Sequence, residues 1–360
     1  MSNTFGEYLR ITTWGESHGP GIGVVIDGLP AGIPVSIEKI ADDLARRRPG
    51  GALASARQEP DTPQIQSGLV DGLTLGSPLA IWIESVDARP QDYDALSELY
   101  RPGHADFTTE ARYGIRDARG GGRASARETA ARVAAGSVAR ALLDREYGIE
   151  IVGWVDSIGS VSAEVNPTVV GFDQVEASPV RCPDGNCSVA IVEQIEAARE
   201  AGDSLGGWVG VVARGVPAGW GDPVFAKVKS LLGSAMLSIP AAVAMELGDG
   251  VAATTRTGSQ NNDQMTSDGS GGMRQETNRS GGLQGGITSG APVWARVGFK
   301  PTSTIATAQE TINTSGEAVV FEGKGRHDPC VVPRAVPIVE AMMALVLADR
   351  MLASRATPPT

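Results

Sequence analysis

The stretch VVIDGLPAG, residues 24–32, is a short apolar run that ends in a turn rich in Gly and Pro. β-Branched residues followed by Asp27-Gly28 are typical of a strand that ends in a tight turn. The stretch VVARGVPAG, residues 211–219, repeats the pattern, and apolar residues at helical spacing follow each copy. We therefore expect a strand–turn–helix unit that occurs twice in one fold; the alternative is a chance similarity of two strand–turn pieces.

Further elements follow from periodicity. A strand is predicted over residues 79–84, and helices over 125–146 and 336–352, with Pro337 in the first turn of the last helix. Because the last helix is apolar nearly all round, we expect it to be buried. Strands and helices do not alternate regularly enough for a doubly wound parallel sheet, so the predicted class is α+β. The helices expected after the two repeats rest on Ile37, Ile40, Ala41 and Leu44, and on Phe225, Val228, Leu231, Leu232 and Met236.

Composition limits the classes of function. The 360 residues carry a formal net charge of −11, which does not favour binding to nucleic acid or to anionic membranes. The three cysteines form neither a disulfide framework nor a metal-site spacing. The N-terminus lacks the pattern of a signal peptide, and the longest apolar run, residues 341–348, is too short to span a bilayer, so we expect a cytoplasmic protein.

No linker clearly divides the chain. We expect a single domain over residues 1–360, with a disordered tail at 354–360. The most polar and Gly-rich segment, residues 258–290, reads either as a flexible linker or as an ordered ligand loop. Its Asn, Gln, Asp, Arg and Met residues favour the loop.

All three histidines lie within dense polar or Gly-rich motifs. His18 lies in WGESHGPG, His104 in RPGHAD and His327 in KGRHDPC. A lone histidine is more often structural, but loops punctuated by Gly and Pro raise His18 and His104 as candidates for proton transfer near neutral pH. For His327 a structural role is favoured.

Arginine-rich loops form a second group of candidate site residues. The segment RGGGR, residues 119–123, leads into the predicted helix, and such a loop presents backbone N–H groups to an anion. Arg127 and Arg132 add positive charge where a helix start prefers acids, which indicates a phosphate-bearing ligand. Residues 46–48, three arginines, close a helix, where they also offset its dipole. Residues alone thus indicate an enzyme for an anionic, phosphorylated ligand with histidine acid–base groups; they do not supply a flavin.

Eight segments resemble motifs of the chorismate synthases, in that family's order, from residue 14 to about residue 342. They are WGESHGPGIGVVIDGLPAG, RRRPGG, RPGHADFT, YGIRDARGGGRASARETAARVAAG, GSQNND, GGLQGGITSG, KPTSTI and GRHDPCVVPRAVPIVEAM. The resemblance implies a trans-1,4-elimination of phosphate from 5-enolpyruvylshikimate 3-phosphate that requires reduced FMN, with NADPH only as the indirect reductant of the flavin. It also implies a homotetramer and a layered sandwich of antiparallel sheets around helices.

The same resemblance implies roles for individual residues. His18 corresponds to the acid that protonates the departing phosphate, His104 to the group beside the reduced flavin, and Asp328 to the carboxylate that assists removal of the C6 proton. Ser17 and Ser125 correspond to a pair that orients this relay. The implied substrate contacts are Arg47, Arg101, Arg127 and Arg326, and the implied flavin contacts are Arg123, Ala124, Ser125, Pro240, Ala241, Gly285, Lys300, Pro301, Thr302, Ser303, Thr304 and Arg326.

The sequence departs from the family pattern at one place that bears on substrate binding. Leu53 stands where many members have an arginine, and Arg57 lies close enough in sequence to substitute. Two other classes of function fit the sequence less well. A flavin oxidoreductase that consumes NAD(P)H is disfavoured because no dinucleotide-binding fingerprint is present, and a nucleic-acid-binding module because the chain is acidic.

Overall fold

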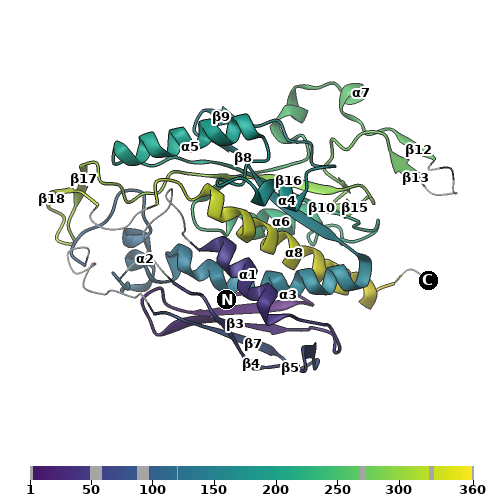
Figure 1. Cartoon of the computed structure of the whole chain (residues 1–360), viewed down its shortest axis with the longest axis horizontal. Coiled ribbons are helices and arrows are strands. Elements are labelled where there is room, and N and C mark those ends of the chain that lie inside the picture. Colours follow the sequence, from purple (N-terminus) through teal and green to yellow (C-terminus); the bar gives the residue numbers. More distant parts are fainter. Residues whose placement is uncertain are drawn as a thin grey trace.

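Two five-stranded antiparallel sheets enclose a layer of helices in the computed structural model, which describes residues 3–48, 59–86, 97–119, 121–267, 269, 273–323 and 328–358 (Figure 1). The arrangement confirms the α+β class. One hydrophobic cluster includes residues of both sheets and of the helices between them. No helix in the described ranges is both long enough and apolar enough to cross a membrane.

The first sheet is built around the strand that the sequence repeat predicts. Its order is β1-β2-β3-β7-β4, and β3 occupies the centre. Trp14 and Trp82 stack on its outer face with ring centroids 5.1 Å apart. They cross β3 at Gly23, where a Cβ would lie 2.6 Å from the Trp14 ring, so the glycine makes room for the stack. The strands are β1 (Thr4–Phe5), β2 (Arg10–Gly15), β3 (Gly21–Asp27), β4 (Pro63–Ser67) and β7 (Leu79–Glu84).

The second sheet has the other repeat at its centre. Its order is β11-β16-β10-β8-β9, and β10 pairs antiparallel with both β8 and β16. The strands are β8 (Glu150–Ile158), β9 (Val161–Ser162), β10 (Gly207–Arg214), β11 (Ala242–Leu247) and β16 (Val293–Phe299).

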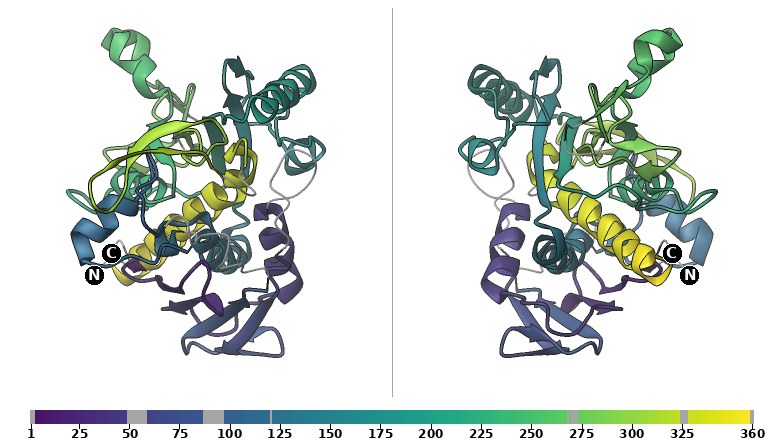
Figure 2. Two further views of the ribbon diagram at one scale, coloured as in Figure 1. Left: turned by 90° about the vertical axis from the view of Figure 1, so that its left-hand side faces the viewer. Right: turned by 90° about the vertical axis from the view of Figure 1, so that its right-hand side faces the viewer.

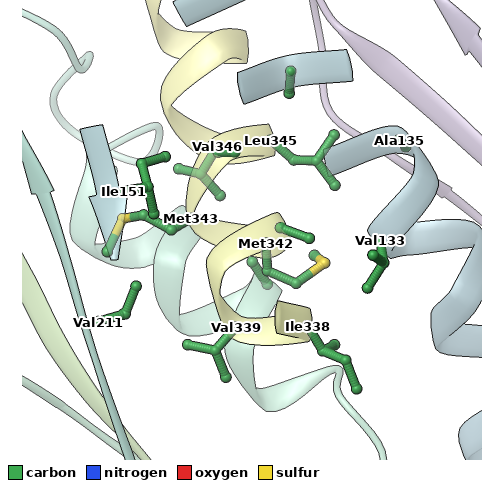
Figure 3. Close-up of a cluster of buried hydrophobic side chains, with 14 of the residues drawn as sticks. Val133, Ala135, Ile151, Val211, Ile338, Val339, Met342, Met343, Leu345 and Val346 are labelled. Atoms are coloured by element: carbon green, nitrogen blue, oxygen red, sulfur yellow. The ribbon is translucent and has the colours of Figure 1, made fainter. Parts of the chain in front are cut away.

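Four helices fill the space between the sheets: α1 (Ile37–Arg47), α3 (Thr129–Tyr147), α6 (Val228–Leu237) and α8 (Val332–Ala356). α3 packs on the first sheet, α8 packs on the second, and the two helices contact each other (Figures 1 and 2). α8 is buried on nearly all sides, as its composition predicts. Figure 3 shows its apolar side chains between α3 and the second sheet, with Val133, Ala135, Ile151, Val211, Ile338, Val339, Met342, Met343, Leu345 and Val346 labelled.

The remaining elements are short or peripheral. α5 (Gly185–Glu200) lies against β8 and β9. The segment from residue 258 to 290 forms a short helix and hairpins in its described part, rather than an extended linker. The others are α2 (Asp106–Tyr113), α4 (Phe172–Glu176), α7 (Gly258–Asn261), β5 (Leu69–Val70), β6 (Leu73–Thr74), β12 (Met265–Ser267), β13 (Met273–Gln275), β14 (Leu283–Gln284), β15 (Ile287–Thr288), β17 (Gln309–Ile312), β18 (Ala318–Phe321) and the 3₁₀ turns Gly122–Ala124, Ala126–Glu128 and Gly250–Thr255.

Three element boundaries correct the sequence predictions. α8 begins at Val332, so Pro337 lies inside the helix; Pro333 occupies the first turn, where its missing N–H costs no helical hydrogen bond. α8 also continues to Ala356, so residues 354–356 of the expected tail are helical.

α3 begins at Thr129, because Ser125 has an extended backbone and caps a separate 3₁₀ turn. Phe225 precedes α6 and is 90% exposed, so it is not part of the apolar helix face.

The α3–α8 crossing yields a prediction about stability. A Cβ at Gly136 would lie 2.3 Å from the Cβ of Ala341, so Gly136→Ala should force the helices apart and lower the free energy of unfolding by about 1–3 kcal/mol. Denaturant unfolding measures the change. Gly233→Ala is the matched control, because a Cβ there meets nothing within 4 Å and alanine favours helix. Equal destabilisation by both variants would contradict this packing argument.

Candidate active site

A cavity of about 520 Å³ lies where five chain segments meet, and we call it the smaller cavity. It collects most of the predicted flavin contacts together with His104 and Asp328. The segments are the loop before α2, the start of the 125–129 turn, the α6–β11 connection, the loop after β16, and the approach to α8 with its first turns. Its predicted lining residues are Arg101, His104, Arg123, Ala124, Ser125, Pro240, Ala241, Lys300, Pro301, Thr302, Ser303, Thr304 and Asp328.

A second cavity of about 750 Å³, the larger cavity, adjoins the smaller one. It is bounded by the N-terminal strand, α2 and the Gly-rich loop. Six residues belong to both linings, so the two cavities share a wall: His104, Ala105, Arg123, Ala124, Arg132 and Ser238.

Two glycines of the Gly-rich loop, Gly121 and Gly122, let its backbone approach the shared wall closely. Gly121 and Gly122 have φ values of +88° and +53°, a region that favours glycine. A Cβ on Gly121 would lie 2.9 Å from Cε1 of His104, and one on Gly122 would lie 2.8 Å from Oε2 of Glu16. The glycines therefore bring the backbone of this loop against the imidazole.

The smaller cavity is strongly cationic. Among its described lining residues, five arginines or lysines face one carboxylate, that of Asp328. Lys300 donates to the carbonyl of Gly103 at 3.0 Å and to Oγ of Ser303 at 2.7 Å, which fixes the loop after β16 against the His104 loop. Such a lining favours an anionic ligand.

One buried carboxylate, that of Glu128, orients the cations of the shared wall, directly or through Thr13. Arg132 donates from Nε to Glu128 at 2.9 Å, and Arg123 donates to Oγ1 of Thr13 at 2.6 Å. Thr13 in turn donates to Glu128 at 2.9 Å. The guanidiniums therefore have fixed directions, which a bidentate oxyanion site needs.

His104 lies in a second charged group. Its Nδ1 is 2.9 Å from Oδ1 of Asp106, whose carboxylate also accepts hydrogen bonds from the backbone N, Nε and Nη2 of Arg101. Burial raises the pKa of Asp106, but the hydrogen bonds from Arg101 and His104 outweigh it and hold that pKa well below its usual range. Asp106 is therefore a carboxylate at neutral pH.

Ser17 and His18 contact each other, and Ser17 contacts the Gly-rich loop at Arg119. Oγ of Ser17 is 3.1 Å from Nδ1 of His18 and donates to the carbonyl of Arg119 at 3.3 Å. Neither residue lines the two cavities as the described residues form them. Their neighbour Glu16 does line the larger cavity, and burial raises its pKa.

Comparison with known proteins identifies the family. The chorismate synthase family profile matches residues 9–352. Curated chorismate synthases of Trichodesmium erythraeum and Synechococcus elongatus are 50% and 51% identical, over 98% and 99% of this chain and 95% and 99% of theirs. The chain belongs to the chorismate synthase family. A solved structure titled as a chorismate synthase superposes with a TM-score of 0.77 at 33% identity, covering 97% of this chain and 93% of that one.

Two arginines that the chorismate synthase resemblance assigns to substrate bind an internal carboxylate here. Arg47 and Arg127 both form ion pairs with Asp61, and Arg127 also donates to the carbonyl of Glu84 at 3.1 Å. Both are nearly fully buried and line neither cavity within the described residues. Their contact with substrate stays a prediction.

Several other residues of the chorismate synthase motifs lie away from the smaller cavity or outside the described residues. Gly285 lies in the β14–β15 turn and does not line that cavity as described. Outside the described residues lie Leu53, Arg57, Arg326 and His327.

The sequence analysis missed one cation of the smaller cavity, Arg334. It singled out Arg132, with Arg127, as a charge near a helix start that indicates a phosphate-bearing ligand, and Arg132 does line this cavity. Arg334 lies in the first turn of α8 and binds Asp328 with an N–O distance of 2.9 Å. A cation at a helix start is the conflict that drew attention to Arg127. Arg334 is also a cation at a helix start, but the sequence does not show this, because periodicity predicts that the helix begins after this residue.

Proposed function

We propose that this chain catalyses the trans-1,4-elimination of phosphate from 5-enolpyruvylshikimate 3-phosphate to give chorismate, with reduced FMN as the form of the flavin. One observation carries the proposal: residues of two chorismate synthase motifs, 123–125 and 300–304, meet the implied flavin contacts 240–241 on one cationic cavity, and His104 and Asp328 lie in its wall.

The residues of the smaller cavity fit a flavin mononucleotide. A phosphate needs cations and hydroxyls, which Lys300 and residues 302–304 offer. A planar ring needs apolar surface, which Ile239, Val331 and Ile338 offer. Reduced FMN, when bound, supplies electron density to the substrate.

The proposed work of the chain's own residues is charge stabilisation and proton movement. The cationic lining, which includes Arg101 and Arg123, would stabilise the departing phosphate. A carboxylate at Asp328 would assist removal of the C6 proton, and Arg334 fixes its orientation. His18, coupled to Ser17, would give a proton to the leaving phosphate.

An anaerobic assay tests the proposed function. We expect chemically reduced FMN, with no nicotinamide present, to support release of phosphate and formation of chorismate in equal amounts. Oxidised FMN serves as the control and should give neither product. Net oxidation of one flavin per phosphate released, or an absolute need for NAD(P)H as a consumed substrate, would instead favour a flavin oxidoreductase.

We also propose that the fold contains an internal duplication within one domain. β3 and β10 are each the central strand of a five-stranded sheet. Each is followed by a glycine with positive φ, Gly28 at +87° and Gly215 at +82°, and each turn leads towards an inner helix. The hydrophobic cluster shared by both sheets supports a single domain. Family resemblance carries two further proposals, a homotetramer and a cytoplasmic location.

A further inference from the structure

His104 is held at one ring nitrogen by a buried acid that no family motif role accounts for. Asp106, the first residue of α2, places Oδ1 2.9 Å from Nδ1 of His104. The carboxylate side chain is 3% exposed, whereas the imidazole is 19% exposed. The acid borders the larger cavity and contacts two side chains that line the smaller one, Arg101 and His104. Its contact with the imidazole is the one that bears on the position of a proton.

Arg101 fixes the position of this carboxylate. Oδ2 of Asp106 accepts the backbone N of Arg101 at 3.1 Å and Nε at 2.8 Å, while Oδ1 accepts Nη2 at 2.8 Å. Arg116 adds an ion pair, with its Nη1 3.6 Å from Oδ1. With both oxygens engaged, the carboxylate has one orientation toward the ring.

The contacts at Nδ1 indicate which ring nitrogen carries the proton. Nη2 of Arg101 also lies 3.1 Å from Nδ1, so Nδ1 could in principle accept from Arg101 or donate to Asp106. An unprotonated Nδ1 would point its lone pair at a carboxylate oxygen 2.9 Å away, and two lone pairs at that distance repel. A proton on Nδ1 turns the same contact into a charge-assisted hydrogen bond.

The other edge of the ring meets the cavities. The Cε1–Nε2 edge lies toward Gly121, and His104 belongs to the wall between the smaller and larger cavities. Within the described part of the chain, no hydrogen bond to Nε2 is formed. This nitrogen is thus the one that a ligand in the cavity can use.

We propose that Asp106 is a positioning residue that keeps a proton on Nδ1 of His104, so that Nε2 is the nitrogen that exchanges a proton with bound ligand. The catalytic part of this inference rests on the proposed function, while the proton position does not. The arrangement resembles the way a buried acid orients a histidine in hydrolase triads.

Asp106→Asn tests the inference, because Arg101 should orient the new amide so that its NH₂ group faces Nδ1 of His104. Two donors of Arg101 meet Oδ2, so the amide oxygen should occupy that position and turn the NH₂ group toward Nδ1. Nδ1 must then accept, and the proton moves to Nε2. We expect turnover to fall by about 10- to 100-fold with little change in KM, since the wrong tautomer impairs proton transfer rather than binding.

The matched control is Glu110→Gln. Glu110 lies on the same helix and binds Arg116 at 3.0 Å, but it does not contact His104. This variant removes the same charge from α2 and should keep normal turnover. Equal losses in both variants would show that the effect is general weakening of α2 and would overturn the positioning role.

Solid-state ¹⁵N NMR of histidine-labelled holoenzyme reads the proton position directly. The chain has only three histidines, and His104→Gln identifies the signals of His104. At alkaline pH we expect protonated Nδ1 and unprotonated Nε2 in the wild type, and the reverse in Asp106→Asn. A wild-type ring protonated at Nε2 alone overturns the inference even if Asp106→Asn does not fold. A wild type with the expected tautomer but no chorismate formation would refute the proposed function and leave the tautomer assignment standing.

Discussion

His104→Ala is expected to lower the rate of chorismate formation by roughly 10²- to 10⁴-fold, the scale of lost acid–base catalysis. Of the two histidines that the structure describes, His104 lies in the wall between the two cavities, in contact with the buried Asp106–Arg101 pair. The substitution keeps the arginines and the lysine that line the smaller cavity, so we expect reduced FMN still to bind. Stopped-flow turnover with reduced FMN and a flavin-binding titration measure the two effects separately.

His18→Ala provides an informative comparison. The family resemblance predicts a similar loss of turnover for His18, although this side chain contacts Ser17 and lines neither cavity as the described residues form them. A loss in both variants would support a two-histidine proton relay across that loop. Wild-type turnover in both would refute the assignment of proton transfer to these residues.

Glu340→Ala is expected to lower the free energy of unfolding by about 3–5 kcal/mol, the usual result of removing one partner of a buried ion pair. Glu340 is fully buried on α8. It accepts hydrogen bonds from Arg46 of α1 at 2.6 Å, from Arg140 of α3 at 3.1 Å and from the backbone N of Gly153 on β8 at 2.8 Å. The substitution removes the hydrogen-bonded counter-ion of both guanidiniums and leaves Asp43, 3.9 Å from each, as their remaining buried carboxylate. Equilibrium unfolding in denaturant at pH 7 should reveal the loss.

A control and a pH series make this prediction specific. Glu176→Ala removes a second, partly exposed partner of Arg46 and should cost no more than about 1 kcal/mol.

Although burial raises the pKa of Glu340, Arg46 and Arg140 outweigh it and lower that pKa below the ordinary 4.5. A carboxyl whose folded-state pKa is lowered stabilises the fold above its ordinary pKa and loses that contribution as pH falls. The gap between wild type and Glu340→Gln should therefore be constant near pH 7 and shrink below about pH 4.5; a gap that widens on acidification would contradict this account.

The local sequence was enough to predict the strands and turns that neighbouring residues set. The apolar residues that open the stretch 24–32 lie in β3, the turn that follows bends at Gly28, and the strand predicted at 79–84 is β7. Each is set by side-chain alternation and by glycine's access to positive φ, both readable within a few residues. The predicted helix starts were wrong at two places. Two prolines could each mark the start of α8, and Ser125 caps a 3₁₀ turn that precedes α3.

The sequence motifs also predicted which segments meet at the smaller cavity. The segments 101–104, 123–125 and 300–304 and the residue Asp328 stand out by their motifs, and the folded chain brings them to one cavity. The motifs could not show which charge meets which. Arg46, Arg47 and Arg48 are adjacent in sequence, yet Arg46 binds Glu340, 294 residues away, while Arg47 binds Asp61.

Only the tertiary structure made those choices. Burial of an unpaired charge costs free energy, so a buried charged side chain needs a counter-charge close to it. How the sheets and helices stack decides which counter-charge that is, and spacing along the chain does not. For the same reason the sequence by itself determined a family, its motifs and most of its elements, whereas the orientation of His104 by Asp106 and the diversion of Arg47 and Arg127 to Asp61 became visible only in the folded chain.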